Sequence, residues 1–190
     1  APGLDVDDSG KVVVGSDAVA QVGDTVYTNL QEAINAAQDG SDKTVEILKD
    51  FDVDLTNGTN KNGIYTITGN ITIDGNNRTI KATGTPTSDV HVFVVSGSAN
   101  AKIIDLNING NDIAHYGIQA YGSSAKLELD DVEAYACEAY GVFSNNGATV
   151  TAANLRTHGN EWGGVNVDHG STFTMKSGHL ADRFSVVVDG

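Results

Sequence analysis

Two stretches of the sequence align with each other at a separation of 23 residues. "EAYGVFSNNGATVTA" at 138–152 and "EWGGVNVDHGSTFTM" at 161–175 share Glu, Gly-Val, Gly and Thr at equivalent positions. Similar segments begin at residues 92 and 116, and a shorter one begins at residue 184. A period of this length indicates a repeat protein, in which each unit packs mainly against its neighbours.

Each repeat alternates apolar and polar residues, and Gly, Asn, Asp and Ser separate the alternating runs. This pattern predicts short strands joined by turns. Several strands per unit predict a parallel solenoid, because each strand then pairs with its copy in the next coil. A leucine-rich repeat would show Leu at fixed offsets, and a propeller blade needs about 40 residues. We therefore expect an all-β, right-handed parallel β-helix with 21–25 residues per coil.

The period also predicts which side chains face the interior. Stacked strands lie about 4.8 Å apart, so residues at equal positions form continuous columns. The three expected inward columns are Ile118, Val142, Val165 and Val186; Leu127, Val150 and Phe173; and Leu129, Ala152 and Met175.

The N-terminal segment does not follow the repeat. An amphipathic helix is predicted there, with a capping box formed by Thr28 and Gln31 and an end at Gly40. Its apolar face is expected to contain Leu30, Ala33, Ile34 and Ala37.

Strands are predicted after the helix at 44–48 and 51–55. An open strand edge invites unwanted pairing, so we interpret the helix as a cap over the first coil. The expected organisation is a single domain over residues 1–190, with N-terminal strands and the capping helix in 1–60 and the coils in 61–190.

Composition restricts the partners. The formal net charge of −14 repels nucleic acid and anionic lipid. The sequence holds no run of 18 apolar residues, so membrane insertion is not expected. Cys137 is the only cysteine, which leaves no internal disulfide.

The segment "VYTNLQEAINAAQDGSDKTVEILKDFDVDL", followed by "NITIDGNNRTI", resembles right-handed parallel β-helix domains of bacterial, especially Gram-positive, surface proteins. These domains belong to the pectate-lyase-like superfamily. The resemblance implies an extracellular protein, secreted or anchored to the cell wall, and a monomeric domain or a fragment of a longer surface protein. The superfamily includes pectate lyases, polygalacturonases, other glycoside hydrolases, phage tailspikes and non-catalytic glycan-binding adhesins, so the fold alone does not define the activity.

One motif bears on the enzymatic members. Pectate lyases of this superfamily carry Val-Trp-Ile-Asp-His, and Val165-Asn166-Val167-Asp168-His169 keeps the Val, Asp and His but lacks the Trp. Short matches of this kind also arise by chance in a repeated sequence.

Outward residues at equal positions form columns as well. One column holds Gln119, Phe143, Asn166 and Val187, and the next holds Tyr121, Asn145, Asp168 and Asp189. Aromatic faces beside amides and carboxylates suit a neutral sugar, although the same residue types also form ladders that only pack across strands. Trp162 lies in the loop that enters this strand, at a position occupied by His91 and His115 in earlier coils. The predicted ligand-binding residues are Tyr121, Phe143, Asn145, Trp162, Asn166 and Asp168.

Glu138 and Glu161 occupy equal positions in neighbouring coils. A close carboxylate pair raises the pKa of one member, as a general acid requires, and a retaining glycosidase needs carboxyl groups roughly 5 Å apart. Acids also fall into register on solvated faces without any such role. If the protein is an enzyme, the expected catalytic residues are Glu138, Glu161, Asp168 and His169.

No cofactor is expected, and the one metal considered is Ca²⁺, with Asp168 and Asp189 as its candidate ligands. "DLNINGND" at 105–112 matches the opening of a Ca²⁺ loop, but Tyr116 stands where the loop needs Glu. The alternation there predicts an outward strand face instead.

The favoured hypothesis is a non-catalytic bacterial surface adhesin or carbohydrate-binding domain that recognises a host or plant glycan or a host surface glycoprotein. The alternatives are a polysaccharide lyase or glycoside hydrolase of the β-helix type, and a structural stalk.

Overall fold

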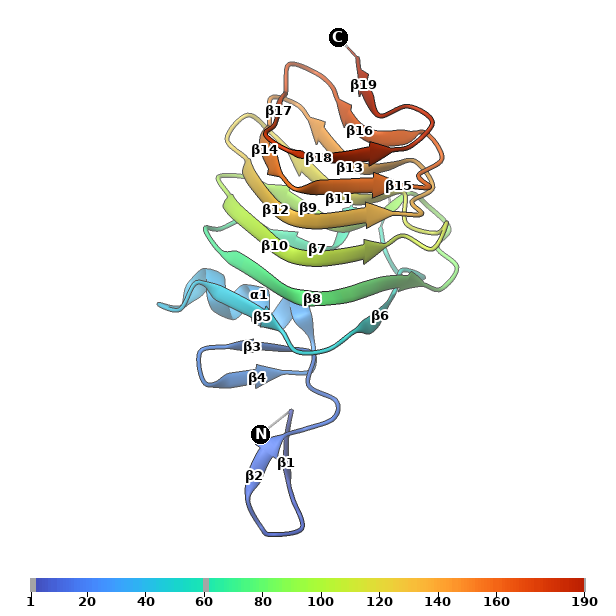
Figure 1. Cartoon of the computed structure of the whole chain (residues 1–190). Helices are drawn as coiled ribbons and strands as arrows, with labels where there is room; N and C mark the ends of the chain where they lie inside the picture. Colours follow the sequence, from blue (N-terminus) through green and yellow to red (C-terminus); the bar gives the residue numbers. More distant parts are fainter. Residues whose placement is uncertain (1–2, 60–61, 190) are drawn as a thin grey trace.

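The alternating segments form two stacks of parallel strands. The computed structural model describes residues 3–59 and 62–189. Each later coil contributes to both stacks, so that strands far apart in the sequence lie side by side (Figure 1). Within the described residues the smaller stack is a six-stranded sheet of β7 (Asn62–Ile67), β9 (Val90–Ser96), β11 (Tyr116–Tyr121), β13 (Tyr140–Asn145), β16 (Gly163–Val167) and β19 (Val186–Val188).

The larger stack has eleven strands in the described part of the chain. Two of them, β3 (Ala20–Val22) and β4 (Thr25–Tyr27), join in antiparallel fashion at one end. The parallel strands are β5 (Thr44–Ile47), β6 (Phe51–Asp54), β8 (Thr72–Thr83), β10 (Asn100–Asn109), β12 (Lys126–Tyr135), β14 (Thr149–Ala153), β15 (Leu155–His158), β17 (Thr172–Met175) and β18 (Gly178–Ala181).

The predicted inward columns are confirmed by the strand register. Val142 pairs with Ile118 on one side and with Val165 on the other, and Val165 pairs in turn with Val186. The other two columns also pair as expected, from Leu127 to Phe173 and from Leu129 to Met175. These columns form most of one continuous core, which the parallel β-helix buries between its two sheets.

Coil length decreases along the chain. Val165 pairs with Val186, 21 residues on, and Val142 pairs with Val165, 23 residues on. The earlier coils are longer, since Thr72 pairs with Lys102, 30 residues on. A shift in register within β8 accounts for part of the extra length. β5 and β6 already stack on β8, within the segment expected to precede the coils, and the expected boundary at residues 60 and 61 lies outside the described residues.

Each coil turns a corner within the larger sheet at a residue with positive φ. Asp105, Asp131 and Asn154 occupy this corner in successive coils, with φ of 50°, 52° and 51°. Asn and Asp adopt this left-handed conformation more readily than other residues with a Cβ. The corner therefore gives a structural reason for a repeated polar residue.

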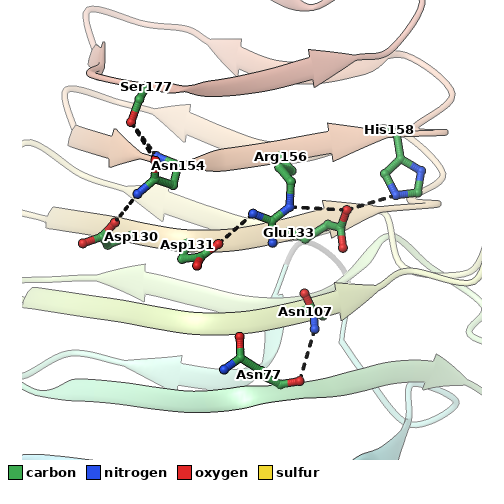
Figure 2. A network of polar contacts seen from close by, with 9 residues as sticks. All are labelled: Asn77, Asn107, Asp130, Asp131, Glu133, Asn154, Arg156, His158 and Ser177. Atoms are coloured by element: carbon green, nitrogen blue, oxygen red, sulfur yellow. Dashed lines mark hydrogen bonds and ion pairs between the residues drawn. The ribbon is translucent and has the colours of Figure 1, made fainter.

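Polar side chains link neighbouring strands on the outer face of the larger sheet (Figure 2). Ser177 donates to Asn154 at 3.1 Å, and Asn154 donates to Asp130 at 3.2 Å. Arg156 donates to Asp131 at 2.7 Å. These side chains are largely exposed, so each contact contributes at most about 1 kcal/mol.

The helix α1 (Leu30–Asp39) caps the first coil, and its predicted apolar face of Leu30, Ala33, Ile34 and Ala37 is buried. The predicted capping box is wrong by one residue. Asn29 is the N-cap, and its side chain accepts from the backbone N–H groups of Gln31 and Glu32. Gln31 instead fixes the helix to β7, because its amide group accepts from the N–H of Thr66 at 2.7 Å and donates to the Thr66 carbonyl at 3.0 Å. Gly40 is the C-cap, as predicted.

The two ends of the stack differ (Figure 1). At the N-terminal end, β3 and α1 cover the first coil, and a separate hairpin of β1 (Leu4–Val6) and β2 (Val12–Val14) extends beyond them. At the C-terminal end, β17, β18 and β19 have neighbours on one side only among the described residues, and Phe184 is exposed. In the part of the chain that the structure describes, no helix has the length and apolar character needed to cross a bilayer.

Shortening one inward column should destabilise the coil stack. Leu129 is fully buried between Ile103 and Ala152, so Leu129→Ala should lower the free energy of unfolding by about 2–5 kcal/mol. Glu128→Ala is the matched control, because Glu128 points outward and loses only an exposed ion pair to Lys102. Urea unfolding followed by circular dichroism measures both. Equal losses in the two variants would contradict the inward assignment.

The single thiol should be inert in the folded protein. Burial raises the pKa of Cys137 to about 12, so almost no thiolate exists at pH 8. We expect a disulfide reagent to modify native Cys137 about a thousandfold more slowly than the urea-unfolded chain. Ser98→Cys in a Cys137→Ala background provides the control, because Ser98 lies in an exposed turn and should react at once. Fast labelling of the native wild-type protein would show that Cys137 is not buried.

Candidate functional site

A cleft of about 630 Å³ lies on the outer face of the six-stranded sheet. Strands β7, β9, β11 and β13 and the residues just before β9 and β11 supply its walls. The lining residues are Asn62, Asp89, His91, Val94, Ser96, His115, Tyr116, Gln119, Tyr121, Phe143 and Asn145.

Two of the predicted outward columns form part of this lining. Gln119 lies between Val94 and Phe143 in the strand register, and Tyr121 lies between Ser96 and Asn145. Side chains two residues apart on a strand share a face, so the two columns run side by side. The result is a surface with aromatic rings, amides and a hydroxyl in close succession.

A row of stacked rings forms one wall of the cleft. Tyr116 stacks on His91 at 4.3 Å between ring centroids and contacts His115 at 4.4 Å and Phe143 at 4.7 Å. Burial, with a smaller contribution from Asp89, raises the pKa of Tyr116 to about 12. The Tyr116 phenol therefore keeps its proton at neutral pH.

His91 is the most enclosed member of this wall. It is 1% exposed, and neither ring nitrogen has a hydrogen-bond partner among the described residues. Burial, and then the neighbouring His115, lowers its pKa to about 3, so the imidazole is neutral. Its lone pair is thus not blocked by a proton.

His115 lies between two carboxylates. Its Nε2 atom is 3.9 Å from Asp89 Oδ2, and its Nδ1 atom is 3.4 Å from Glu138 Oε2. The imidazole is mostly buried, whereas about half of each carboxylate side chain is exposed. The column of His91 and His115 was visible in the sequence, but Asp89 follows a loop whose path leaves no periodic signal.

The structure brings together three of the six predicted ligand-binding residues. Tyr121, Phe143 and Asn145 line the cleft. The Tyr121 ring is 45% exposed, whereas Phe143 is only 8% exposed. Tyr116 and Tyr140 lie against Phe143, so it supports the floor and offers little area for stacking.

Asn166 and Asp168 continue the two columns one coil further, outside the residues that line the cleft. Asn166 is 4% exposed and donates to Asp189 at 3.1 Å. Asp168 accepts from the backbone N–H of His169 at 2.6 Å. The two candidate Ca²⁺ ligands, Asp168 and Asp189, therefore already accept hydrogen bonds from protein donors.

Trp162 lies in a separate depression of about 460 Å³, with Tyr140, Glu161, Arg183, Phe184 and Val187. Its ring is 49% exposed and meets His115 and Tyr140 edge-on, at 5.5 and 5.9 Å. Trp162 therefore ends the row of rings on the side away from the cleft.

The four residues proposed for an enzyme fall into different surroundings. The backbone N–H groups of Glu138 and Glu161 bond to Ala114 and Cys137, which places the two acids one coil apart. Glu138 faces His115, and Glu161 lines the Trp162 depression. His169 Nδ1 lies 2.7 Å from Asp168 Oδ1 in an exposed turn. The four residues thus do not line one common cleft.

Comparison with known proteins agrees with this architecture. Residues 90–186 match the family model described as "Right handed beta helix region". No curated protein and no solved structure matches the chain. The match spans more than half of the chain and the coils that build the cleft, so this protein belongs to the right-handed β-helix family.

Proposed function

We propose that the chain is a non-catalytic glycan-binding domain of a bacterial surface protein, and that the cleft above β9, β11 and β13 binds the sugar. The observation that carries the proposal is the exposed Tyr121 ring beside the amides of Gln119 and Asn145. Such a cleft offers both a stacking surface and hydrogen-bonding groups.

The chemistry of the lining suits an uncharged sugar. An aromatic ring stacks on the C–H face of a pyranose, and amides bind hydroxyls as donors and as acceptors. Asn62, Ser96 and the Tyr116 phenol add further polar groups around the same space. A volume of about 630 Å³ lies in the range of small-molecule sites, which corresponds to a short segment of a glycan.

Charge narrows the class of glycan. The chain has a formal net charge of −14, and Asp89 lies in the wall of the cleft. These charges repel sulfated or uronate-rich polymers. A neutral host or plant glycan, free or on a surface glycoprotein, is therefore the expected ligand. Such a ligand is met outside the cell, so we propose an extracellular, secreted or cell-wall-anchored location.

Binding is favoured over catalysis and over a purely structural role. The alternative of a polysaccharide lyase or glycoside hydrolase needs an acid and a base in one cleft, whereas Glu161, Asp168 and His169 are not in its lining. A stalk requires no shaped surface, whereas this face carries a cleft with a partly exposed aromatic ring.

Removing the exposed ring should weaken glycan binding. We expect Tyr121→Ala to raise the Kd for the best ligand about tenfold, because ring stacking contributes roughly 1 kcal/mol or more. Tyr135→Ala is the matched control, since Tyr135 lies on the larger sheet, where it stacks on His158. A glycan array identifies the ligand, and isothermal titration calorimetry measures its Kd.

Two results would overturn this proposal. One is a correctly folded wild-type protein that binds no glycan on the array, which would favour a stalk. The other is release of sugar ends from a polysaccharide, lost in Glu161→Gln or Asp168→Asn, which would establish an enzyme.

A further inference from the structure

We propose that Asp89, His115 and Glu138 form a binding site for a divalent transition-metal ion of the Zn²⁺ class at the rim of the cleft. The inference does not depend on the glycan proposal, because it concerns a different ligand and residues that were not assigned to the sugar.

The three side chains come from the entrances of three successive strands in the six-stranded sheet. Asp89 precedes β9, His115 precedes β11 and Glu138 precedes β13. Each offers one potential ligand atom, and these atoms all lie within 4.8 Å of one another. Stacking of the coils therefore converges three ligands that are distant in the sequence.

The geometry is close to that of a bound ion. In a tetrahedral Zn²⁺ site with bonds near 2.1 Å, ligand atoms lie roughly 3.4 Å apart. The ring of His115 is held by Tyr116 at 4.4 Å and by the edge of Trp162 at 5.5 Å. Asp89 and Glu138 are about half exposed, so their ends can move by the ångström that coordination requires.

His91 supplies an independent indication of a missing partner. Buried ring nitrogens normally have a hydrogen-bond partner, and both nitrogens of His91 lack one among the described residues. Its ring centroid lies 5.8 Å from that of His115, in the same wall of the cleft. An additional polar species beside these two imidazoles would satisfy this requirement.

The donor set selects the class of metal. An imidazole with two carboxylates suits Zn²⁺ and its neighbours in the transition series, whereas Ca²⁺ prefers sites made of six to eight oxygens. Three protein ligands leave at least one position of the ion open. Asp89 and His115 line the 630 Å³ cleft, and Asp89 and Glu138 line a second hollow of about 460 Å³ formed with residues 84–88. Water or a ligand oxygen can reach the open position from either side.

The electrostatic field favours a cation at this rim. Both carboxylates lie close to one imidazole, and the chain as a whole has a formal net charge of −14. A divalent ion between Asp89 and Glu138 would neutralise their mutual repulsion. Half-exposed ligands still compete with water, so we expect micromolar rather than nanomolar affinity.

Direct metal titration tests the proposal without any sugar. Untagged full-length protein is stripped with a chelator and titrated with ZnCl₂ by calorimetry, and with CoCl₂ by visible absorption, which reports the coordination geometry. We expect one ion per chain with a micromolar Kd. Glu138→Gln should weaken Zn²⁺ binding about tenfold or more, and His115→Gln should abolish binding in the micromolar range.

The repeat provides a close control. Glu161 stands one coil beyond Glu138 and faces no imidazole in the described residues, so Glu161→Gln should bind Zn²⁺ as the wild type does. His169→Gln tests an exposed His-Asp pair in the same way. Circular dichroism confirms that each variant folds.

Three outcomes would overturn the proposal. The first is a folded wild type that does not bind Zn²⁺ at millimolar concentration. The second is an unchanged affinity in Glu138→Gln and His115→Gln. The third is a preference of the same residues for Ca²⁺ over Zn²⁺. Because glycan binding is measured separately on Tyr121→Ala, failure of one proposal leaves the other intact.

Discussion

Backbone hydrogen bonding between successive coils is the constraint on which the rest of this structure depends. Parallel ladders hold equal positions of neighbouring coils about 4.8 Å apart, so every side chain belongs to a column. Inward columns such as Ile118, Val142 and Val165 form the core without any helix packed across it. Outward columns are brought together by the same ladders. A surface site in this fold is therefore assembled from residues about two dozen positions apart, and a linear motif is a poor guide to it.

Repeated polar residues in such a fold have two different causes. Asp105, Asp131 and Asn154 recur because the corner of each coil needs positive φ, and the polar contacts of Figure 2 lie on the same sheet. The similarity of 105–112 to a Ca²⁺ loop follows from this corner, since the neighbouring Leu106 and Ile108 are buried as in an ordinary strand. Gln119 and Tyr121 are not among the residues with positive φ. Local geometry does not explain their identity, which makes them better candidates for recognition.

The sequence predicted the stacking of later coils well, because their period is constant and their columns alternate cleanly. It could not predict the first coils to the residue, since the register shift in β8 and the loop at 84–89 add residues that carry no periodic signal. That loop positions Asp89, which is why the carboxylate was missed. The exposure of Phe143 was also beyond the pattern, because it depends on how the rings of Tyr116 and Tyr140 lie over it. Periodicity determines the face of a residue, and neighbouring side chains determine its accessibility.

Glu138 and Glu161 show how far equal positions can differ in chemistry. The ladder places both acids at the same point of adjacent coils, yet one meets the imidazole of His115 and the other lies in a depression with Trp162 and Arg183. The backbone repeats, but the side chains one coil away do not. A repeat therefore supplies many equivalent positions, and function arises where one coil places an unlike partner opposite its neighbour. The entrances of β9, β11 and β13 are such a place, because the column there changes from histidine to acid within a single step.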